Sequence, residues 1–280
     1  MQEPPVQRLF PPDDPVPLEG LYLGENLRAE GSAERPFVYA NFVSSLDGRI
    51  ALAMPHRRTH QVPAAIANAR DWRLYQELGA QADLLVTSAR YFRQYAAGEA
   101  QDSLPVGPGE AFADLRQWRL DQGLPAQPDI ALLSASLDIP AAAIEAYRGR
   151  RIHLFTGEDA DPAALARLES AGVEIHFAGP GLSAEGDAVV RRLGELGYAR
   201  IYAIAGPSVF YTLLRAGRID RLYLSLAQRL LGGKDFDTLV WGSHLEPPVS
   251  LRLRSLHLDT AAPEGAGQLL TAYDVLEAAP

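Results

Sequence analysis

Short apolar runs rich in β-branched and aromatic residues alternate along most of this 280-residue chain with longer segments of helical spacing. This alternation is typical of βαβ units, in which helices join parallel strands and cover the sheet that the strands form. Several runs are almost continuously apolar, as in strands that are buried on both faces. We therefore expect an α/β fold around a largely parallel sheet.

Nine runs have the strand pattern: residues 37–43, 83–87, 130–134, 151–156, 173–177, 200–205, 222–227, 250–258 and 269–275. Five segments have helical spacing and end at or near glycine, a common helix stop: residues 64–79, 111–122, 162–172, 184–197 and 207–216. Because helical segments are missing between the last strands of the sequence, we expect the sheet to end in antiparallel strands.

The first 34 residues are rich in proline and acidic residues and show no sustained period. We interpret residues 1–34 as an N-terminal arm that wraps around the body or projects from it. The body itself is then a single α/β domain that spans residues 35–280.

Composition excludes several classes of protein. The chain has no cysteine, which excludes disulfides, thiolate metal sites and cysteine nucleophiles. Its formal net charge is −9 and its basic residues form no run, which argues against nucleic-acid and anionic membrane partners and favours a small-molecule ligand. It shows neither a signal peptide nor a run of about 20 apolar residues, so we expect a cytoplasmic protein.

A tight Gly-Pro turn joins the strand at 200–205 to the helical segment 207–216. Pro207 suits the first helical turn, Gly206 lets a ligand approach the backbone, and Ser208 offers a hydroxyl. The free amides of a first helical turn also attract anions, so we interpret this turn as a seat for a phosphate or pyrophosphate. The alternative is a turn that only connects a strand to a helix.

Polar residues also follow the strand at 83–87, at the edge where open α/β sheets bind ligands. Arg90 could contact a nucleotide phosphate, or it could be a solvated surface residue. Thr87 and Ser88 could contribute hydroxyls, or they could merely cap the segment that follows.

Two catalytic classes and a metal site are disfavoured. The sequence contains neither a GxSxG nor a GxxxxGK[ST] motif, which argues against serine hydrolases and P-loop NTPases. His56 and His60 have a spacing that could bind a metal ion, but the intervening Arg57-Arg58-Thr59 and the flanking prolines favour a loop. We expect no metal site.

In order and spacing, several motifs resemble one family: Arg35-Pro36-Phe37, Ser45-Leu46-Asp47-Gly48-Arg49, Val86-Thr87-Ser88, Ala205-Gly206-Pro207-Ser208, and Ala216-Gly217-Arg218-Ile219-Asp220 through Leu230-Leu231-Gly232-Gly233. Over about residues 35–276 the chain is similar to the reductase domain of the bifunctional riboflavin-biosynthesis deaminase-reductases. The resemblance implies a three-layer α/β/α, dihydrofolate-reductase-like fold with a mostly parallel central sheet. It also implies an NADPH groove at the carboxyl ends of the strands, and a homodimer.

The resemblance assigns roles to individual residues. The residues expected to contact NADPH are Gly206, Pro207, Ser208, Val209 and Phe210 at the pyrophosphate, and Ser134, Thr156 and Ser88 at neighbouring strand ends. The family tends to carry glycine where Ser88 and Arg90 stand, so Arg90 is this chain's own candidate for the 2′-phosphate, or it could clash with a family cofactor contact. On the substrate side, the family commonly has a lysine where this chain has Asn41 and an acid where it has Ile204. Because of these two departures, the resemblance does not identify the substrate.

The leading hypothesis is an NADPH-dependent reductase that transfers a hydride to a small aminopyrimidine, pterin or related C=N or C=O substrate. An activity like that of 5-amino-6-(5-phosphoribosylamino)uracil reductases would fit the resemblance. Asn41, Ser45 and Asp47 are expected to face the substrate; Asp47 could instead be a turn acid bonded to backbone amides. The alternatives are a non-catalytic nucleotide- or pterin-binding protein that retains the fold, and a structural dimerisation domain.

Overall fold

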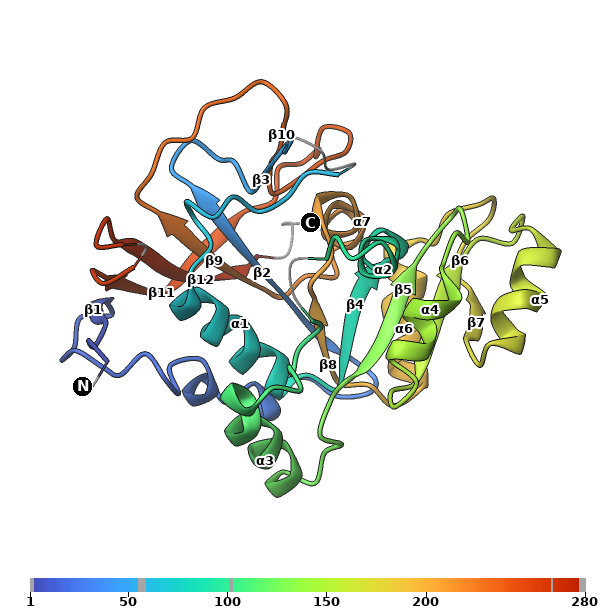
Figure 1. Cartoon of the computed structure of the whole chain (residues 1–280), viewed down its shortest axis with the longest axis horizontal. Helices are drawn as coiled ribbons and strands as arrows, with labels where there is room; N and C mark the ends of the chain where they lie inside the picture. Colours follow the sequence, from blue (N-terminus) through green and yellow to red (C-terminus); the bar gives the residue numbers. More distant parts are fainter. Residues whose placement is uncertain (1–2, 55–58, 101–102, 263, 277–280) are drawn as a thin grey trace.

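The computed structural model describes residues 3–54, 59–100, 103–262 and 264–276, and within them ten strands form one sheet of order β1-β11-β12-β9-β2-β8-β4-β5-β6-β7 (Figure 1). The strands are β1 (Gln7–Phe10), β2 (Phe37–Ser45), β4 (Leu84–Ser88), β5 (Asp129–Leu133), β6 (Ile152–Thr156), β7 (Glu174–Phe177), β8 (Arg200–Ala203), β9 (Arg221–Ala227), β11 (Leu251–Asp259) and β12 (Gln268–Val275). β3 (Ala51–Leu52) and β10 (Phe236–Asp237) pair separately.

The direction of the strands changes within the sheet. From β9 through β2, β8, β4, β5 and β6 to β7 every neighbouring pair is parallel, whereas β9, β12, β11 and β1 pair antiparallel. All nine predicted strands are present, with ends within two residues of the predicted ones. The predicted parallel sheet with antiparallel C-terminal strands is therefore confirmed.

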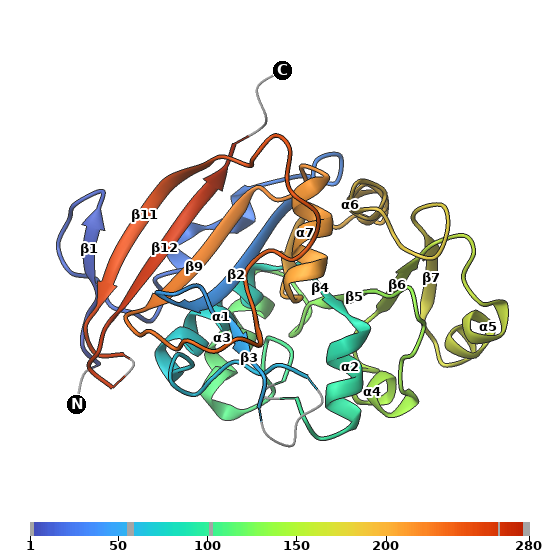
Figure 2. The same cartoon turned by 90° about the horizontal axis from the view of Figure 1, so that it is seen from above.

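Helices cover both faces of the sheet (Figures 1 and 2). They are α1 (Ala69–Gln81), α2 (Ala89–Ala96), α3 (Ala113–Asp121), α4 (Ala141–Ala146), α5 (Pro162–Ser170), α6 (Gly186–Glu195) and α7 (Pro207–Arg215), with short 3₁₀ turns at Leu23–Glu25, Leu27–Ala29 and Glu110–Phe112. Side chains of α1, α2, α4 and α5 share one apolar core, and those of α6 and α7 share the other. The predicted three-layer α/β/α architecture is confirmed.

The two cores arise because the central strands carry apolar side chains on both faces. In β2, Tyr39 faces the α1 side and packs against Tyr202 with ring centroids 4.9 Å apart, while Val38 faces the α6 and α7 side. Successive side chains of a strand point to opposite faces, so one continuous apolar run supplies both cores.

Helix prediction was less accurate than strand prediction. α1 begins at Ala69, five residues after the predicted start, because the Asn68 side chain accepts a hydrogen bond from the Asp71 amide and caps the helix there. The sequence analysis missed α2 and α4, which have eight and six residues and show few turns of periodicity.

The N-terminal arm packs on the body. β1 pairs with β11 at the edge of the sheet, and Leu18, Tyr22 and Leu27 are buried in the core on the α1 side. The buried Glu77 of α1 accepts hydrogen bonds from the amides of Gly20 and Tyr22 at 2.6 and 3.0 Å. These contacts hold the arm against the helix.

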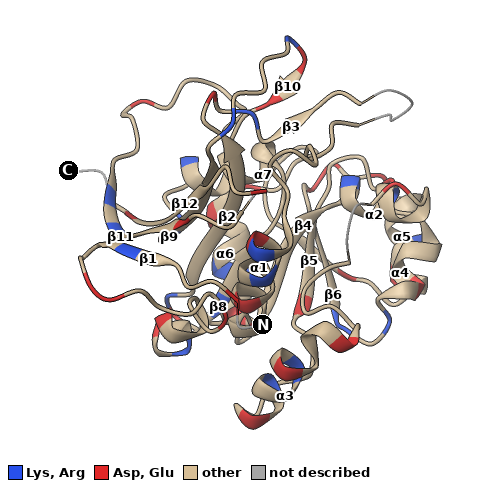
Figure 3. Ribbon diagram, turned by 60° about the vertical axis from the view of Figure 1, so that its left-hand side comes forward, with Lys and Arg blue, Asp and Glu red and all other residues tan. Residues whose placement is uncertain are grey.

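Charged residues of both signs are interspersed along α1 and α3 (Figure 3). Arg73 of α1 donates a hydrogen bond to Asp114 of α3 at 3.1 Å, and this contact holds α3 against α1. Among the described residues, no helix combines the length and the apolar character needed to cross a membrane.

Candidate active site

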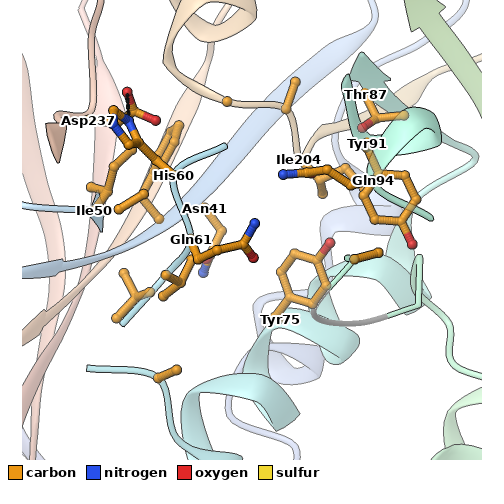
Figure 4. A pocket seen from close by; sticks show the side chains of 18 of the residues that line it. Asn41, Ile50, His60, Gln61, Tyr75, Thr87, Tyr91, Gln94, Ile204 and Asp237 are labelled. Atoms are coloured by element: carbon orange, nitrogen blue, oxygen red, sulfur yellow. Dashed lines mark ion pairs between the residues drawn. The ribbon is translucent and has the colours of Figure 1, made fainter. Parts of the chain in front are cut away.

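A cavity of about 590 Å³ opens at the carboxyl ends of β4 and β8, beside the middle of β2. Its lining includes Asn41 from β2, Thr87 and Ser88 from β4, and Ile204 after β8, and α1 closes one side (Figure 4). Open α/β sheets bind ligands at this edge because several strand ends and helix N-termini meet there. The cavity is therefore the candidate site.

Two buried polar groups in the lining are incompletely satisfied within the described structure. The Asn41 amide nitrogen and the Asp71 Oδ1 atom are both buried and have no hydrogen-bond partner among the described residues. Burial raises the pKa of Asp71 to about 6, because a carboxylate is poorly solvated there, and the Ser225 hydroxyl offsets only part of this rise. An unsatisfied polar group costs folding free energy, so these two atoms point to a ligand.

Asp71 is positioned by the capped N-terminus of α1. Asn68 caps the helix and donates to Gln268 of β12 at 3.0 Å, and Gln268 donates to the buried Asp259 of β11 at 3.1 Å. Arg70 also donates to Asp259, at 2.7 Å. The first turn of α1 is thus tied to the antiparallel end of the sheet.

Aromatic side chains form one wall of the cavity. Trp72 and Tyr75 of α1 stack with ring centroids 4.7 Å apart, and Tyr91 of α2 also lines the cavity. Figure 4 shows Tyr75 and Tyr91 on the same side of the cavity, with Gln94 close by. Flat apolar surfaces beside buried polar groups suit a heteroaromatic ring.

The predicted phosphate seat borders the cavity through Gly206 and Pro207. α7 begins at Pro207 without a side-chain cap, so the amides of Ser208 and Val209 in its first turn are available to an external acceptor. Phe210 has a different environment: it is buried and packs edge-on against Phe42 at 5.0 Å, so it supports the turn from the core.

Of the hydroxyl residues predicted at other strand ends, Ser88 lines the cavity, whereas Ser134 and Thr156 lie outside the lining. The Ser134 hydroxyl accepts a hydrogen bond from the Leu137 amide at 3.1 Å. The Thr156 hydroxyl donates to the Leu182 carbonyl at 3.2 Å. Both hydroxyls therefore stabilise the loops that follow their strands.

Arg90 lies at the rim of the cavity within a cluster of charges. Its guanidinium is 3.7 Å from the Asp237 carboxylate and donates to the His60 carbonyl at 3.3 Å. The His60 ring nitrogens lie 2.9 Å from carboxylate oxygens of Asp235 and Asp237, and the hydrogen bond to Asp237 contributes most to raising the pKa of His60 (Figure 4). His60 thus pairs with acids, and His56 lies outside the described residues.

Asp47 and Ser45 lie outside the cavity lining. The Asp47 carboxylate accepts hydrogen bonds from the Ser45 hydroxyl and from the amides of Leu231 and Gly232, the latter at 2.7 Å. The hydrogen bond from Ser45 contributes most to lowering the pKa of Asp47 to about 2. These contacts match the alternative in which Asp47 is a turn acid.

Sequence reasoning missed Asp71, Tyr75 and His60 as lining residues. An acid in the first turn of an amphipathic helix usually faces solvent and favours the helix dipole, so Asp71 carried no signal of burial. The position of Asp71 on the sheet side of α1 could have indicated its burial. That position can be assigned only when the first residue of the helix is known.

One protein-family model matches most of the chain. The family model described as the RibD C-terminal domain matches residues 36–264. A sequence search found no significant match among proteins of curated function.

Several solved structures have a similar fold. A pyrimidine reductase-like protein from Corynebacterium diphtheriae aligns with a TM-score of 0.68 at 19% identity, covering 93% of this chain and 99% of that one. RibD from Acinetobacter baumannii aligns with a TM-score of 0.58 at 16% identity. The alignment covers 87% of this chain but only 58% of the RibD chain. The riboflavin biosynthesis reductase Rib7 from Saccharomyces cerevisiae aligns with a TM-score of 0.53 at 12% identity, covering 91% of this chain and 99% of that one. At these identities the similarity shows the fold.

We predict that Asp47→Asn lowers the melting temperature at pH 7, because the amide group accepts hydrogen bonds less strongly than the carboxylate. The folded-state pKa of Asp47 is depressed, so its stabilisation is present above the ordinary value of 3.8 and is lost as the pH falls through about 2. Thermal unfolding at several pH values should show that the difference in melting temperature between wild type and Asp47→Asn narrows below about pH 4. Asp14→Asn, at an exposed aspartate, is the control, and equal melting temperatures for the two variants would contradict the turn-acid role.

Proposed function

The chain belongs to the RibD C-terminal domain family, and on this basis we propose that it is an NADPH-dependent reductase of a small heterocyclic or carbonyl substrate. The observation that supports this most strongly is the composition of one cavity: an uncapped helix N-terminus and a buried, protonatable carboxyl group border the same space. Hydride transfer to a C=N or C=O carbon needs both a dinucleotide seat and a proton source.

The residues around Gly206 fit a dinucleotide diphosphate. A Cβ atom built on Gly206 would meet nothing within 4 Å, so the glycine leaves open space beside the amides of Ser208 and Val209. These amides would hold the diphosphate at the positive end of α7, and the Ser88 hydroxyl, which belongs to the same lining, would add a further hydrogen bond. When bound, NADPH would supply the hydride.

Arg90 would bind the 2′-phosphate that distinguishes NADPH from NADH. Its side chain is about one-third exposed (36%) and makes a 3.7 Å ion pair and a 3.3 Å hydrogen bond to the His60 carbonyl, contacts that a phosphate would replace with charge-assisted hydrogen bonds. The same ion pair favours the second candidate, a non-catalytic binding protein, in which Arg90 serves only to close the rim with Asp237.

The substrate side would lie between β2 and α1. Trp72 and Tyr75 offer flat surfaces to a ring, and the Asn41 amide and Asp71 carboxyl group offer a donor and a titratable oxygen to its polar edge. Asn41 and Ile204 are uncharged, so recognition there would depend on hydrogen bonds and stacking. Aminopyrimidines and dihydropterins have the complementary chemistry.

Asp71 would provide the proton. Reduction of a C=N or C=O carbon leaves an electron pair on the nitrogen or oxygen, and that atom takes up a proton. With a pKa of about 6, Asp71 retains its proton closer to neutral pH than an ordinary aspartate does. It would be reprotonated from solvent after each turnover.

The first test is calorimetric titration with NADPH and with NADH as the comparison. We expect micromolar binding that favours NADPH, and about tenfold weaker binding to Gly206→Ala, equivalent to about 1.4 kcal/mol. The added methyl group would occupy the open space while the fold stays intact. Gly149→Ala, also in open space but far from the lining, is the matched control.

Failure of either nucleotide to bind, or equal binding by the two alanine variants, would contradict the assigned seat. Binding without NADPH consumption in the presence of aminopyrimidines, including 5-amino-6-(5-phosphoribosylamino)uracil, and dihydropterins would favour the non-catalytic candidate.

We predict that Asp71→Asn lowers kcat at least tenfold and raises stability at pH 8. The folded-state pKa is raised, so the stabilising contribution is complete below about pH 4 and is lost as the pH rises through about 6. Above that pH the buried charge costs up to about 3 kcal/mol, a cost that asparagine avoids. Thermal unfolding at pH 5 and 8 and the pH dependence of kcat are the measurements.

Asp121→Asn, at an exposed aspartate of α3, is the control for both readouts. Wild-type kcat should fall as the pH rises through about 6, and the Asn variant should lose this dependence. A rate profile shared by wild type and Asp71→Asn would exclude Asp71 as the proton donor.

A further inference from the structure

Three metal-ligating side chains converge on β6 and β7, outside the lining of the cavity. His153 of β6 lies opposite Glu174 of β7 in the parallel register, and His176 is two residues further along β7. The period of two in a strand places all three on the face that α6 covers. Strand geometry alone therefore brings them together.

The ligand atoms are close enough to share one ion. His153 Nδ1 lies 3.0 Å from His176 Nε2 and 3.4 Å from a Glu174 carboxylate oxygen, and one ligand atom from each residue lies within 4.8 Å of the others. A tetrahedral Zn²⁺ ion with bonds of about 2.0–2.1 Å separates its nitrogen ligands by about 3.3 Å. The cluster already approximates that spacing.

The hydrogen bonds behind His153 fix its tautomer. The Tyr198 hydroxyl donates to the Asp129 carboxylate at 2.7 Å, so its oxygen must accept the proton of His153 Nε2, 2.8 Å away. His153 Nδ1 is then left with a lone pair that points at His176 and Glu174. Such a carboxylate-linked support is typical of histidines that bind metals.

The charge state of the cluster also suits a cation. The hydrogen bonds to Tyr198 place the proton of His153 on Nε2 and leave Nδ1 unprotonated, and Arg151 donates to the two Glu174 carboxylate oxygens at 3.1 and 3.0 Å. A lone pair of His153 thus faces a carboxylate oxygen at 3.4 Å. A positive ion between them would convert this repulsion into two bonds.

We propose that His153, Glu174 and His176 form a binding site for a first-row divalent cation, with Zn²⁺ preferred. Two imidazoles and one carboxylate favour zinc over magnesium or calcium, which prefer all-oxygen ligands. Glu174 is exposed and His176 is partly exposed, so the fourth position is open to water. The ion would clamp the edge strand β7 onto β6.

Ion binding requires changes at His176 and Arg192. In the structure, Arg192 Nε donates to His176 Nδ1 at 3.4 Å, which places the proton of His176 on Nε2. Zinc at Nε2 requires that proton to move to Nδ1 and Arg192 to turn away. Arg192 already pairs with Glu195 at 3.0 Å, so it keeps a counter-charge when it does so.

The test uses the full chain without an affinity tag, treated with a chelator and then titrated with zinc by calorimetry. We expect one zinc ion per chain, a higher melting temperature with zinc, and affinity reduced by at least about 100-fold in His176→Ala. Glu174→Gln changes an exposed ligand and should weaken binding without affecting folding. His244→Ala, at a histidine that is 82% exposed, is the control.

Equal zinc affinity in His176→Ala and His244→Ala would overturn the proposal, as would the absence of zinc binding to the wild-type chain. In the second case the histidines would form a hydrogen-bonded chain from Arg192 to Asp129 and nothing more. NADPH titration is an independent readout, because the ligands lie outside the cavity lining: zinc should leave nucleotide affinity unchanged.

Discussion

The hydrogen bonds that join Asn68 to Gln268 and Gln268 to Asp259 determine where α1 lies on the sheet. Asp259 is fully buried, and Arg70 is its ion-pair partner. Removing Asn68 or Arg70 would deprive the buried Gln268 amide or the buried Asp259 charge of a partner. The folding free energy lost in this way is much larger than the stabilisation that an exposed ion pair provides. The N-terminus of α1 is therefore strongly constrained. Because Asp71, Trp72 and Tyr75 all project from that part of α1, the same constraint shapes the candidate site.

Asp47 and Asp71 show how two aspartates in one fold acquire opposite properties. Asp47 accepts hydrogen bonds from two backbone amides and a hydroxyl, which favour its charged form and anchor the loop at Leu231 and Gly232. Asp71 is buried with an unsatisfied oxygen, which favours its neutral form. The first arrangement stabilises the fold, whereas the second costs stability and leaves a proton and a hydrogen-bonding atom for a ligand.

Sequence patterns predicted the strands well because the parallel strands are buried on both faces, so their apolar runs are continuous and unambiguous. The family resemblance, together with the polar residues that follow the strands, placed Asn41, Ser88, Arg90, Gly206 and Pro207 around one cofactor and substrate site, and all five line the cavity. Sequence patterns could not show that the hydroxyls of Ser134 and Thr156 bind their own loops. Those contacts, like the burial of Asp71, depend on how distant segments pack, which local pattern does not encode.

The charges at the rim connect ligand binding to the small β3–β10 sheet. Asp237 of β10 is 6% exposed and has two basic neighbours, Arg90 and His60. If Arg90 turned to a phosphate, His60 would remain 2.9 Å from Asp237, so the buried carboxylate would keep a hydrogen-bond partner. The exchange therefore avoids the cost of an unpaired buried ion. The pair of basic partners on Asp237 makes Arg90 available to a phosphate without loosening the segment that covers the cavity.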